Sequence, residues 1–264
     1  MTDPQPRPAD SPRPAGLLEG KVVLVVGASR GIGAEAARLF AREGAAVVLT
    51  ARSEPELAAL AEQLREEGHR AAHVVGDVSS AADTDRFVEV ALESFARLDG
   101  ALNNAAVTQG GRLDELSEED FDRIMAINVK GVWLALRAEL RAMREAGSGS
   151  IVNVSSIGGL KGSSGFGAYQ ATKHAVIGLT RTAAHDNGPA GVRVNALAPG
   201  PVLTPMLRQG GGATPGAIES RIAATPLRKA AEPSEVAEAA AWLLSDRASH
   251  ISGVVLPVDG GFSS

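Results

Sequence analysis

Tyr169 and Lys173 are the two side chains of this sequence whose types and spacing are suited to proton transfer. Tyr169 is the only tyrosine among 264 residues, and Lys173 follows it by four positions. On a helix, this spacing places both side chains on one face. A free phenol has a pKa near ~10, and a close ammonium group lowers that pKa toward the range useful for acid–base chemistry. The spacing alone fits equally well a partly buried tyrosine beside a surface lysine.

A glycine-rich turn, Gly27-Ala28-Ser29-Arg30-Gly31-Ile32-Gly33, could bind phosphate. It follows an apolar run and opens an amphipathic segment. Glycine there permits close backbone approach, while the free amides and positive dipole end of the helix face an anion. The spacing differs from the usual G-x-G-x-x-G, but its place in a first strand–helix unit favours a dinucleotide.

The same turn also matches G-x-S-x-G, the nucleophile elbow of serine hydrolases. That elbow needs a sheet already built upstream, and only a proline-rich tail and a few residues precede Gly27. A triad would also need a histidine such as His250, which nothing specific marks. A hydrolase is therefore disfavoured.

The second expected strand ends Leu49-Thr50-Ala51-Arg52-Ser53, without the acid that selects NAD. Arg52 at this position and Arg30 in the glycine turn could together bind a ribose 2′-phosphate. We therefore predict NADP(H), with NAD(H) and two solvated surface arginines as the alternatives.

Short apolar runs alternate with longer amphipathic stretches from Lys21 onward. The expected strands are 22–26, 45–50, 71–76, 98–103, 151–155, 192–197 and 254–258. The expected helices are 32–42, 54–67, 82–96, 117–145 with a break near Asn128, 168–186 and 232–245. This alternation predicts an α/β fold with a mostly parallel sheet covered by helices on both faces. We expect a disordered tail at 1–17, one domain at 18–264, a long irregular segment at 200–216 and a lid at about 201–225.

In its motifs the chain resembles the short-chain dehydrogenase/reductase family, in the short single-domain form, across residues 18–264. The residues that carry the resemblance are Gly27-x-x-x-Gly31-x-Gly33, Asp77, Asn103-Asn104-Ala105, Asn128, Ser156, Tyr169-x-x-x-Lys173, Pro199-Gly200 and Val258-Asp259-Gly260-Gly261. Val26 and Ala106 depart from it, because the family usually has Thr and Gly there. The resemblance implies a Rossmann-type doubly wound sheet of seven strands, and it is strongest to 3-oxoacyl-carrier reductase-like members, which does not establish an acyl substrate.

By this resemblance, Tyr169 would protonate a carbonyl oxygen or deprotonate an alcohol. Lys173 would hydrogen-bond the nicotinamide ribose and favour the ionised phenol. Ser156 would hydrogen-bond the substrate oxygen, with Ser155 as the competing choice. Asn128 would interrupt its helix and hold a water that links Lys173 to solvent; the alternative is a simple helix-kink asparagine.

The resemblance also implies the cofactor contacts. Asp77 and Val78 would contact the adenine, and Asn104 the adenosine side. The segment Pro199–Thr204 would close over the nicotinamide. The complete predicted cofactor set is Gly27, Ser29, Arg30, Gly31, Ile32, Gly33, Arg52, Asp77, Val78, Asn104, Ala105, Tyr169, Lys173, Pro199, Gly200, Val202 and Thr204.

Composition restricts the remaining functions. A net charge of −5 and a pI near 5.6 give no basic footprint for nucleic acid. The chain has no cysteine, its five histidines lack a metal-ligand pattern, and no apolar run approaches a membrane span. A cytoplasmic location follows by default.

The sequence thus predicts an NADP(H)-dependent oxidoreductase acting on a small or medium keto or hydroxy compound. The alternatives are an NAD(H)-dependent alcohol-oxidising member and a non-catalytic dinucleotide-binding sensor. The family resemblance implies a homo-oligomer, a tetramer or dimer built on the long helices.

Overall fold

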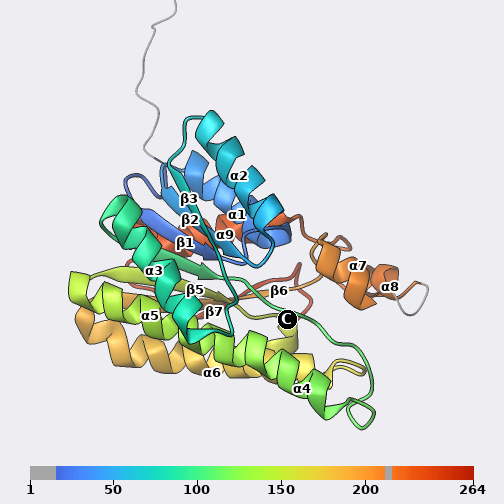
Figure 1. Ribbon diagram of the computed structural model, residues 1–264. Helices are drawn as coiled ribbons and strands as arrows, with labels where there is room; N and C mark the ends of the chain where they lie inside the picture. Colours follow the sequence, from blue (N-terminus) through green and yellow to red (C-terminus); the bar gives the residue numbers. More distant parts are fainter. Residues whose placement is uncertain (1–15, 212–215) are drawn as a thin grey trace, which may run out of the picture.

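The computed structural model describes residues 16–211 and 216–264. Within them, seven strands form one sheet in the order β3-β2-β1-β4-β5-β6-β7 (Figure 1). The strands are β1 (Val22–Val26), β2 (Ala46–Ala51), β3 (Ala71–Val75), β4 (Gly100–Asn103), β5 (Gly149–Val154), β6 (Val192–Pro199) and β7 (Val255–Val258). Every neighbouring pair is parallel, so the predicted doubly wound fold is confirmed.

Helices cover both faces of the sheet (Figure 1). One face carries α1 (Gly31–Arg42), α2 (Glu54–Glu66) and α9 (Pro233–Leu244). The other carries α3 (Ala81–Phe95), α5 (Gly131–Ala146) and α6 (Gly167–Asn187). Alternate residues of β1 enter the two cores, which explains why the run Val22–Val26 is apolar throughout. None of the described helices combines the length and the apolar character of a membrane span.

The strand order creates a crevice at the carboxyl edge of the sheet. From β1 the chain runs outward through β2 to β3 and then returns to pair β4 with the other side of β1. Connections that leave β1 and β4 in opposite directions open a crevice between them, where open α/β sheets bind their ligands. The glycine turn after β1 and Asn104 after β4 border this crevice.

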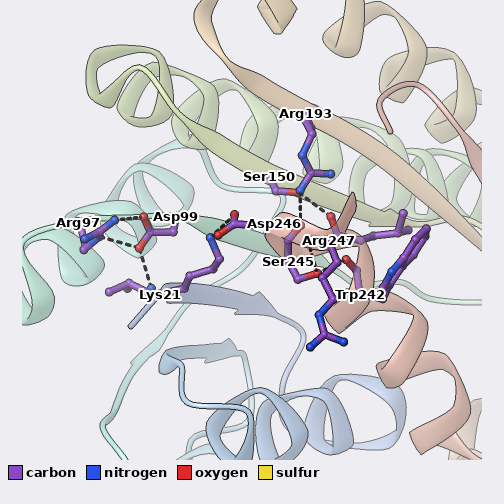
Figure 2. A network of polar contacts seen from close by, with 11 residues as sticks. Lys21, Arg97, Asp99, Ser150, Arg193, Trp242, Ser245, Asp246 and Arg247 are labelled. Atoms are coloured by element: carbon purple, nitrogen blue, oxygen red, sulfur yellow. Dashed lines mark hydrogen bonds and ion pairs between the residues drawn. The ribbon is translucent and has the colours of Figure 1, made fainter. Parts of the chain in front are cut away.

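A polar network closes the opposite, amino-terminal edge (Figure 2). The Asp99 carboxylate, just before β4, accepts hydrogen bonds of 2.8 Å from both the Val22 backbone N–H and Arg97 Nε. Lys21, just before β1, pairs with Asp246 beyond α9 at 2.8 Å. This network joins the starts of β1 and β4 to the segment after α9, and the predicted site residues lie at the other edge.

The irregular segment expected at 200–216 instead contains a helix, α7 (Pro205–Gly211), and α8 (Ala217–Ala223) follows it. The Thr204 hydroxyl accepts the Leu207 N–H at 3.3 Å and thereby caps α7, with proline at its first position. The high glycine and proline content of this segment concealed that helix start. Residues 212–215 of the expected lid lie outside the described residues.

Two other predicted boundaries can be compared with the structure, the helix break and the end of the N-terminal tail. The break near Asn128 is confirmed: a π-helical turn, Ala126–Lys130, separates α4 (Glu118–Met125) from α5. Of the expected 1–17 tail, residues 1–15 lie outside the described residues. Leu17, also assigned to that tail, belongs to the fold, because its N–H donates to the Glu43 carboxylate at 2.6 Å and its side chain packs on the core.

Candidate active site

Tyr169 and Lys173 lie one turn apart near the start of α6, as their spacing predicts. Tyr169 is half-buried, and Lys173 is only 3% exposed. The Lys173 Nζ donates to the Val154 carbonyl at the end of β5 at 2.8 Å and lies 5.6 Å from the centre of the Tyr169 ring. Helix α6 thus holds a phenol and an amine together at the carboxyl end of β5.

Burial moves the pKa values of these two groups in opposite directions. It raises the pKa of the Tyr169 phenol above its usual value of 10.0, and the hydrogen bond with Ser156 opposes this only in part. It lowers the pKa of Lys173 to about 8, because a buried ammonium loses its hydration. The net effect of burial and Ser156 on the Tyr169 pKa is thus upward, and a lowering by the Lys173 ammonium stays a prediction.

The two serines that follow β5 have different partners. Ser155 is buried, and its hydroxyl donates to the Lys173 backbone carbonyl at 2.9 Å. Ser156 is partly exposed, accepts the Gly158 N–H at 3.0 Å and hydrogen-bonds with the Tyr169 phenol. Ser156 is therefore the serine beside the phenol, and Ser155 anchors α6 to β5.

Asn128 lies in the π-helical turn and is 1% exposed. Its Oδ1 accepts the Val107 N–H at 2.8 Å, while its Nδ2 donates to the Val107 carbonyl at 2.9 Å and to the Thr172 hydroxyl at 3.1 Å. The side chain therefore ties this turn to the segment after β4 and to α6, directly beside Lys173. Val107 and Thr172 were not predicted from the sequence, because contacts with a backbone peptide and a hydroxyl leave no motif.

The glycine turn after β1 is packed too closely for side chains. Gly27 has a φ of +86°, and a Cβ there would lie 2.8 Å from the backbone of Ala105. A Cβ on Gly33 would overlap the Gly27 carbonyl, which also accepts a 3.0 Å hydrogen bond from Asn104 Nδ2. Thr50, which was also not predicted, fixes the turn from β2, because its carbonyl accepts the Gly27 N–H at 2.8 Å.

The start of α1 fits a phosphate group. Arg30 precedes the helix, and in the described part of the chain no side chain caps its first N–H groups and no acid occupies its first turn. These N–H groups have no partner within the helix, and the dipole there favours negative charge. Together with the closely packed glycines, this leaves backbone donors open to an anion beside Ser29, Gly31 and Ile32.

Arg52 follows β2 and lies near Asp77, which follows β3, with Nη1 and Oδ2 3.8 Å apart. Burial alone would raise the pKa of Asp77, but hydrogen bonds from Ser79 and the charge of Arg52 together lower it. Arg30 is exposed at the start of α1. Since exposed ion pairs contribute little free energy, both guanidinium groups remain available to a ligand.

Two predicted contact residues have side chains in the core. Val78 is 8% exposed, and its Cγ1 lies 2.9 Å from the position of a Cβ on Gly131. Val202 is 6% exposed and bridges to Ala231. Any contact that these two residues make with a ligand therefore falls to their backbone atoms.

The segment after β6 folds over the glycine turn. Pro199 ends β6, and the Gly200 N–H donates to the Val258 carbonyl at 3.0 Å. The Thr204 methyl then lies 3.3 Å from the position of a Cβ on Gly31. The beginning of the expected lid thus contacts the glycine turn.

A family model described as enoyl-(acyl carrier protein) reductase matches residues 27–263, nearly the whole chain. The chain belongs to the short-chain dehydrogenase/reductase family. The resemblance stated from its motifs is confirmed. As a member, the protein is an oxidoreductase that acts on carbonyl or hydroxyl groups, and the family uses a nicotinamide dinucleotide.

Relatives of this short-chain dehydrogenase/reductase include two named reductases. The A-factor type gamma-butyrolactone 1′-reductase (1S-forming) of Streptomyces virginiae is 48% identical over 250 residues, covering 94% of this chain and 97% of the relative. Levodione reductase of Leifsonia aquatica is 37% identical over 259 residues, covering 95% and 97%.

Solved structures of the family superpose closely. A crystal structure of levodione reductase gives a TM-score of 0.89 at 37% identity, covering 93% of this chain and 98% of the other. A gluconate 5-dehydrogenase from Burkholderia cenocepacia, solved in complex with NADP and tartrate, gives 0.88 at 32% identity, covering 93% and 96%.

Val26 stands where this family usually has threonine, and it lies beside a buried hydroxyl in this short-chain dehydrogenase/reductase. Val26 is the register partner of Thr50 on the neighbouring strand. The Thr50 Oγ1 is buried and has no hydrogen-bond partner among the described residues. Valine at position 26 brings no hydroxyl to this pair of positions.

Proposed function

We propose that the protein is an NADP(H)-dependent carbonyl reductase, or an alcohol dehydrogenase in the reverse direction, with Tyr169 as general acid and base. One observation carries the proposal: the Tyr169 phenol, the Ser156 hydroxyl and the Lys173 amine meet at the carboxyl end of β5. The open start of α1 lies at the same edge of the sheet.

A bound nicotinamide would supply or accept the hydride. In reduction, Tyr169 donates its phenolic proton to the carbonyl oxygen as negative charge develops there, and Ser156 donates a hydrogen bond to the same oxygen. The raised pKa of Tyr169 keeps the phenol protonated at neutral pH, which suits this donor role. Lys173 has a pKa of about 8, so it can return a proton to the phenolate or hydrogen-bond the ribose.

Asn128 completes the proposed proton path through its backbone. Its side-chain amide is already engaged with Val107 and Thr172, so a relay water would bind to the main chain of the π-helical turn. Hydrogen bonds to the main chain of such a turn are possible because its i→i+4 pattern is interrupted. Thr172 joins this turn to Lys173, its neighbour on α6.

The choice of NADP(H) rests on Arg30 and Arg52. Arg52 directly follows β2, at the strand end where NAD-selective members carry an acid, and 65% of its side chain is exposed. Arg30 adds a second exposed guanidinium at the start of α1. The NADP-bound gluconate 5-dehydrogenase supports the same assignment by similarity. NAD(H) is the alternative.

The names of the relatives support a small cyclic keto compound as substrate. The first candidates are γ-butyrolactones that carry a ketone group. Two segments would determine selectivity, the loop 157–167 and the lid 201–225. They meet where the Arg221 guanidinium of α8 stacks 4.5 Å above the Phe166 ring, three residues before Tyr169. This contact puts a cation and an aromatic face at the proposed substrate side.

A spectrophotometric screen of NADPH and NADH oxidation tests the proposal. The panel contains γ-butyrolactone ketones, cyclic diketones, linear ketones and aldehydes, with the Tyr169→Phe variant as control. Turnover with NADPH that disappears in the control supports the proposal. Tight dinucleotide binding without turnover on any carbonyl would favour the sensor instead.

We also propose a homo-oligomer formed through α5 and α6. An apolar hollow on this face is lined by residues of α4, the π-helical turn, α5 and α6, namely Met125, Ala126, Val129, Lys130, Trp133 and Leu179. The Trp133 side chain is 47% exposed although it is large and apolar. Light scattering of the purified protein tests this assembly, and a monomer at all concentrations would contradict it.

A further inference from the structure

Glu139 is a buried acid that the proposed chemistry does not use. It lies on α5 and has no exposed surface. Its Oε2 accepts a 3.0 Å hydrogen bond from Asn103 Nδ2 at the end of β4. Two buried oxygens of this same pair, Glu139 Oε1 and Asn103 Oδ1, have no hydrogen-bond partner among the described residues.

The direction of the surrounding hydrogen bonds fixes which groups must donate. The Thr180 hydroxyl on α6 donates to the Val176 carbonyl at 2.8 Å, so its oxygen accepts from Asn153 Nδ2 at 2.9 Å. The Asn153 Oδ1 therefore accepts from Asn103 Nδ2, also at 2.9 Å. Both hydrogens of this Asn103 nitrogen are then used, by Asn153 and by Glu139. The Asn103 Oδ1 remains as an acceptor that needs a donor.

An ionised Glu139 cannot satisfy that need. A carboxylate is an acceptor only, so it would leave both oxygens unpaired in the core, and an unpaired buried polar group destabilises the fold. A proton on Glu139 Oε1 provides the missing donor for Asn103 Oδ1. Acid and amide then form two parallel hydrogen bonds.

We propose that Glu139 is a neutral carboxylic acid in the folded protein, that it donates from Oε1 to Asn103 Oδ1, and that it acts as a positioning residue for the strand end that packs on the glycine turn. Asn103 is followed by Asn104, whose Nδ2 donates to the Gly27 carbonyl at 3.0 Å. Ala105 comes next, and its backbone lies against Gly27. Only this positioning role rests on the proposed dinucleotide site; the protonation state does not.

The electrostatic surroundings of Glu139 also favour its neutral form. Burial raises the pKa of Glu139 to about 7, opposed only by the hydrogen bond from Asn103. The groups that face it from β4, β5 and α6 are the three uncharged side chains of the network. Arg137 on α5 pairs with Asp85 of α3 at 3.1 Å, and Lys173 on α6 is bound to a backbone carbonyl. No charged group of α3, α6 or the strands contributes to the pKa of Glu139.

A neutral Glu139 in the folded protein makes folding stability depend on pH. The usual glutamate pKa is 4.5, so between pH 4.5 and about 7 the folded chain keeps a proton that the unfolded chain has lost. Stability therefore falls as pH rises through this window and levels off above it. From pH 6 to pH 8.5, Glu139 raises the unfolding equilibrium constant about tenfold, which lowers the melting temperature by about 4 °C.

The test compares wild type with Glu139→Gln, because a glutamine amide can donate to Asn103 Oδ1 and accept from Asn103 Nδ2. Glu145→Gln, an exposed site on the same helix, is the matched control. The melting temperature is measured from pH 6 to pH 8.5. Over this pH range, the melting temperatures of wild type and of the control should fall by about 4 °C more than that of Glu139→Gln. All three proteins share the same histidines, so the effect of histidine titration cancels in this comparison. Parallel curves for all three would overturn the proposal.

A second readout addresses the positioning role. The dissociation constant for NADPH should rise with pH more steeply in wild type than in Glu139→Gln, and equal slopes would remove this role. If no variant binds a dinucleotide, the proposed function fails while the melting comparison still decides the protonation state. If Glu139→Gln does not fold, the protonation state is measured from the infrared carbonyl stretch of wild type labelled with carbon-13 glutamate. A carboxylic-acid band at pH 6 that is lost by pH 8.5 supports a neutral Glu139. The lack of such a band at pH 6 overturns the proposal.

Discussion

Replacing Lys173 by methionine should stabilise the protein while it abolishes turnover. Lys173 is 3% exposed, and its Nζ has one protein partner in the described structure, the Val154 carbonyl at 2.8 Å. No acid lies within ion-pair distance of it in residues 16–211 and 216–264. Methionine has a similar length and no charge, so it fills the same space without the cost of burying an ammonium.

The magnitude follows from the pKa. A lysine pKa lowered from 10.5 to about 8 corresponds to about 3 kcal/mol of destabilisation at pH 7, where the buried amine is still mostly protonated. Losing the hydrogen bond to Val154 costs about 1 kcal/mol. Lys173→Met should therefore raise the free energy of unfolding at pH 7 by about 2 kcal/mol.

The pH dependence has a definite sign. Between pH 8 and pH 10.5 the unfolded chain binds a proton at Lys173 that the folded chain has released, so this residue makes wild-type stability rise with pH in that window. The advantage of Lys173→Met should therefore shrink as pH increases. Urea denaturation at pH 7 and pH 9.5 measures both effects, with the exposed Lys161→Met as control. A Lys173→Met protein that is less stable than wild type at pH 7 would show that burying the Lys173 ammonium does not destabilise the fold.

The other predictions concern the proposed site and assembly. Tyr169→Phe should bind NADPH within about twofold of wild type but lose at least about 10²-fold in kcat, because it lacks the proton donor; intact turnover would contradict its role. Arg52→Asp should raise the KM for NADPH by about tenfold or more without a matching rise for NADH, measured by steady-state kinetics. Gly33→Ala should lower the free energy of unfolding by about 1–3 kcal/mol in denaturant titrations, since its Cβ would overlap the Gly27 carbonyl; an unchanged midpoint would show that the turn can relax. Trp133→Glu should shift the assembly toward monomer in light scattering, because it places a charge in the apolar hollow.

The sequence predicted the elements whose patterns are local. Val22–Val26 has the same bounds in the sequence analysis and in the structure, because a strand buried on both faces is apolar at every position. The helix carrying Tyr169 and Lys173 was expected at 168–186 and spans Gly167–Asn187. The order of motifs was also sufficient to recognise the family.

The features that could not be predicted depend on contacts between residues far apart in the sequence. The raised pKa of Tyr169 follows from the burial of its phenol, which a helical spacing of four does not reveal. Asn128 binds the Val107 backbone, and no residue type identifies such a partner. Glu139 reads as one more acid on an amphipathic helix, and only the packing of α5 on β4 shows that it is buried beside Asn103.

A crystal structure with bound NADPH is the decisive test of the proposed active site. We expect the pyrophosphate at the start of α1 and the nicotinamide ring facing the Tyr169 and Ser156 hydroxyls. The Lys173 Nζ should then contact the nicotinamide ribose. A dinucleotide bound elsewhere, or a Tyr169 hydroxyl directed away from the nicotinamide, would contradict it.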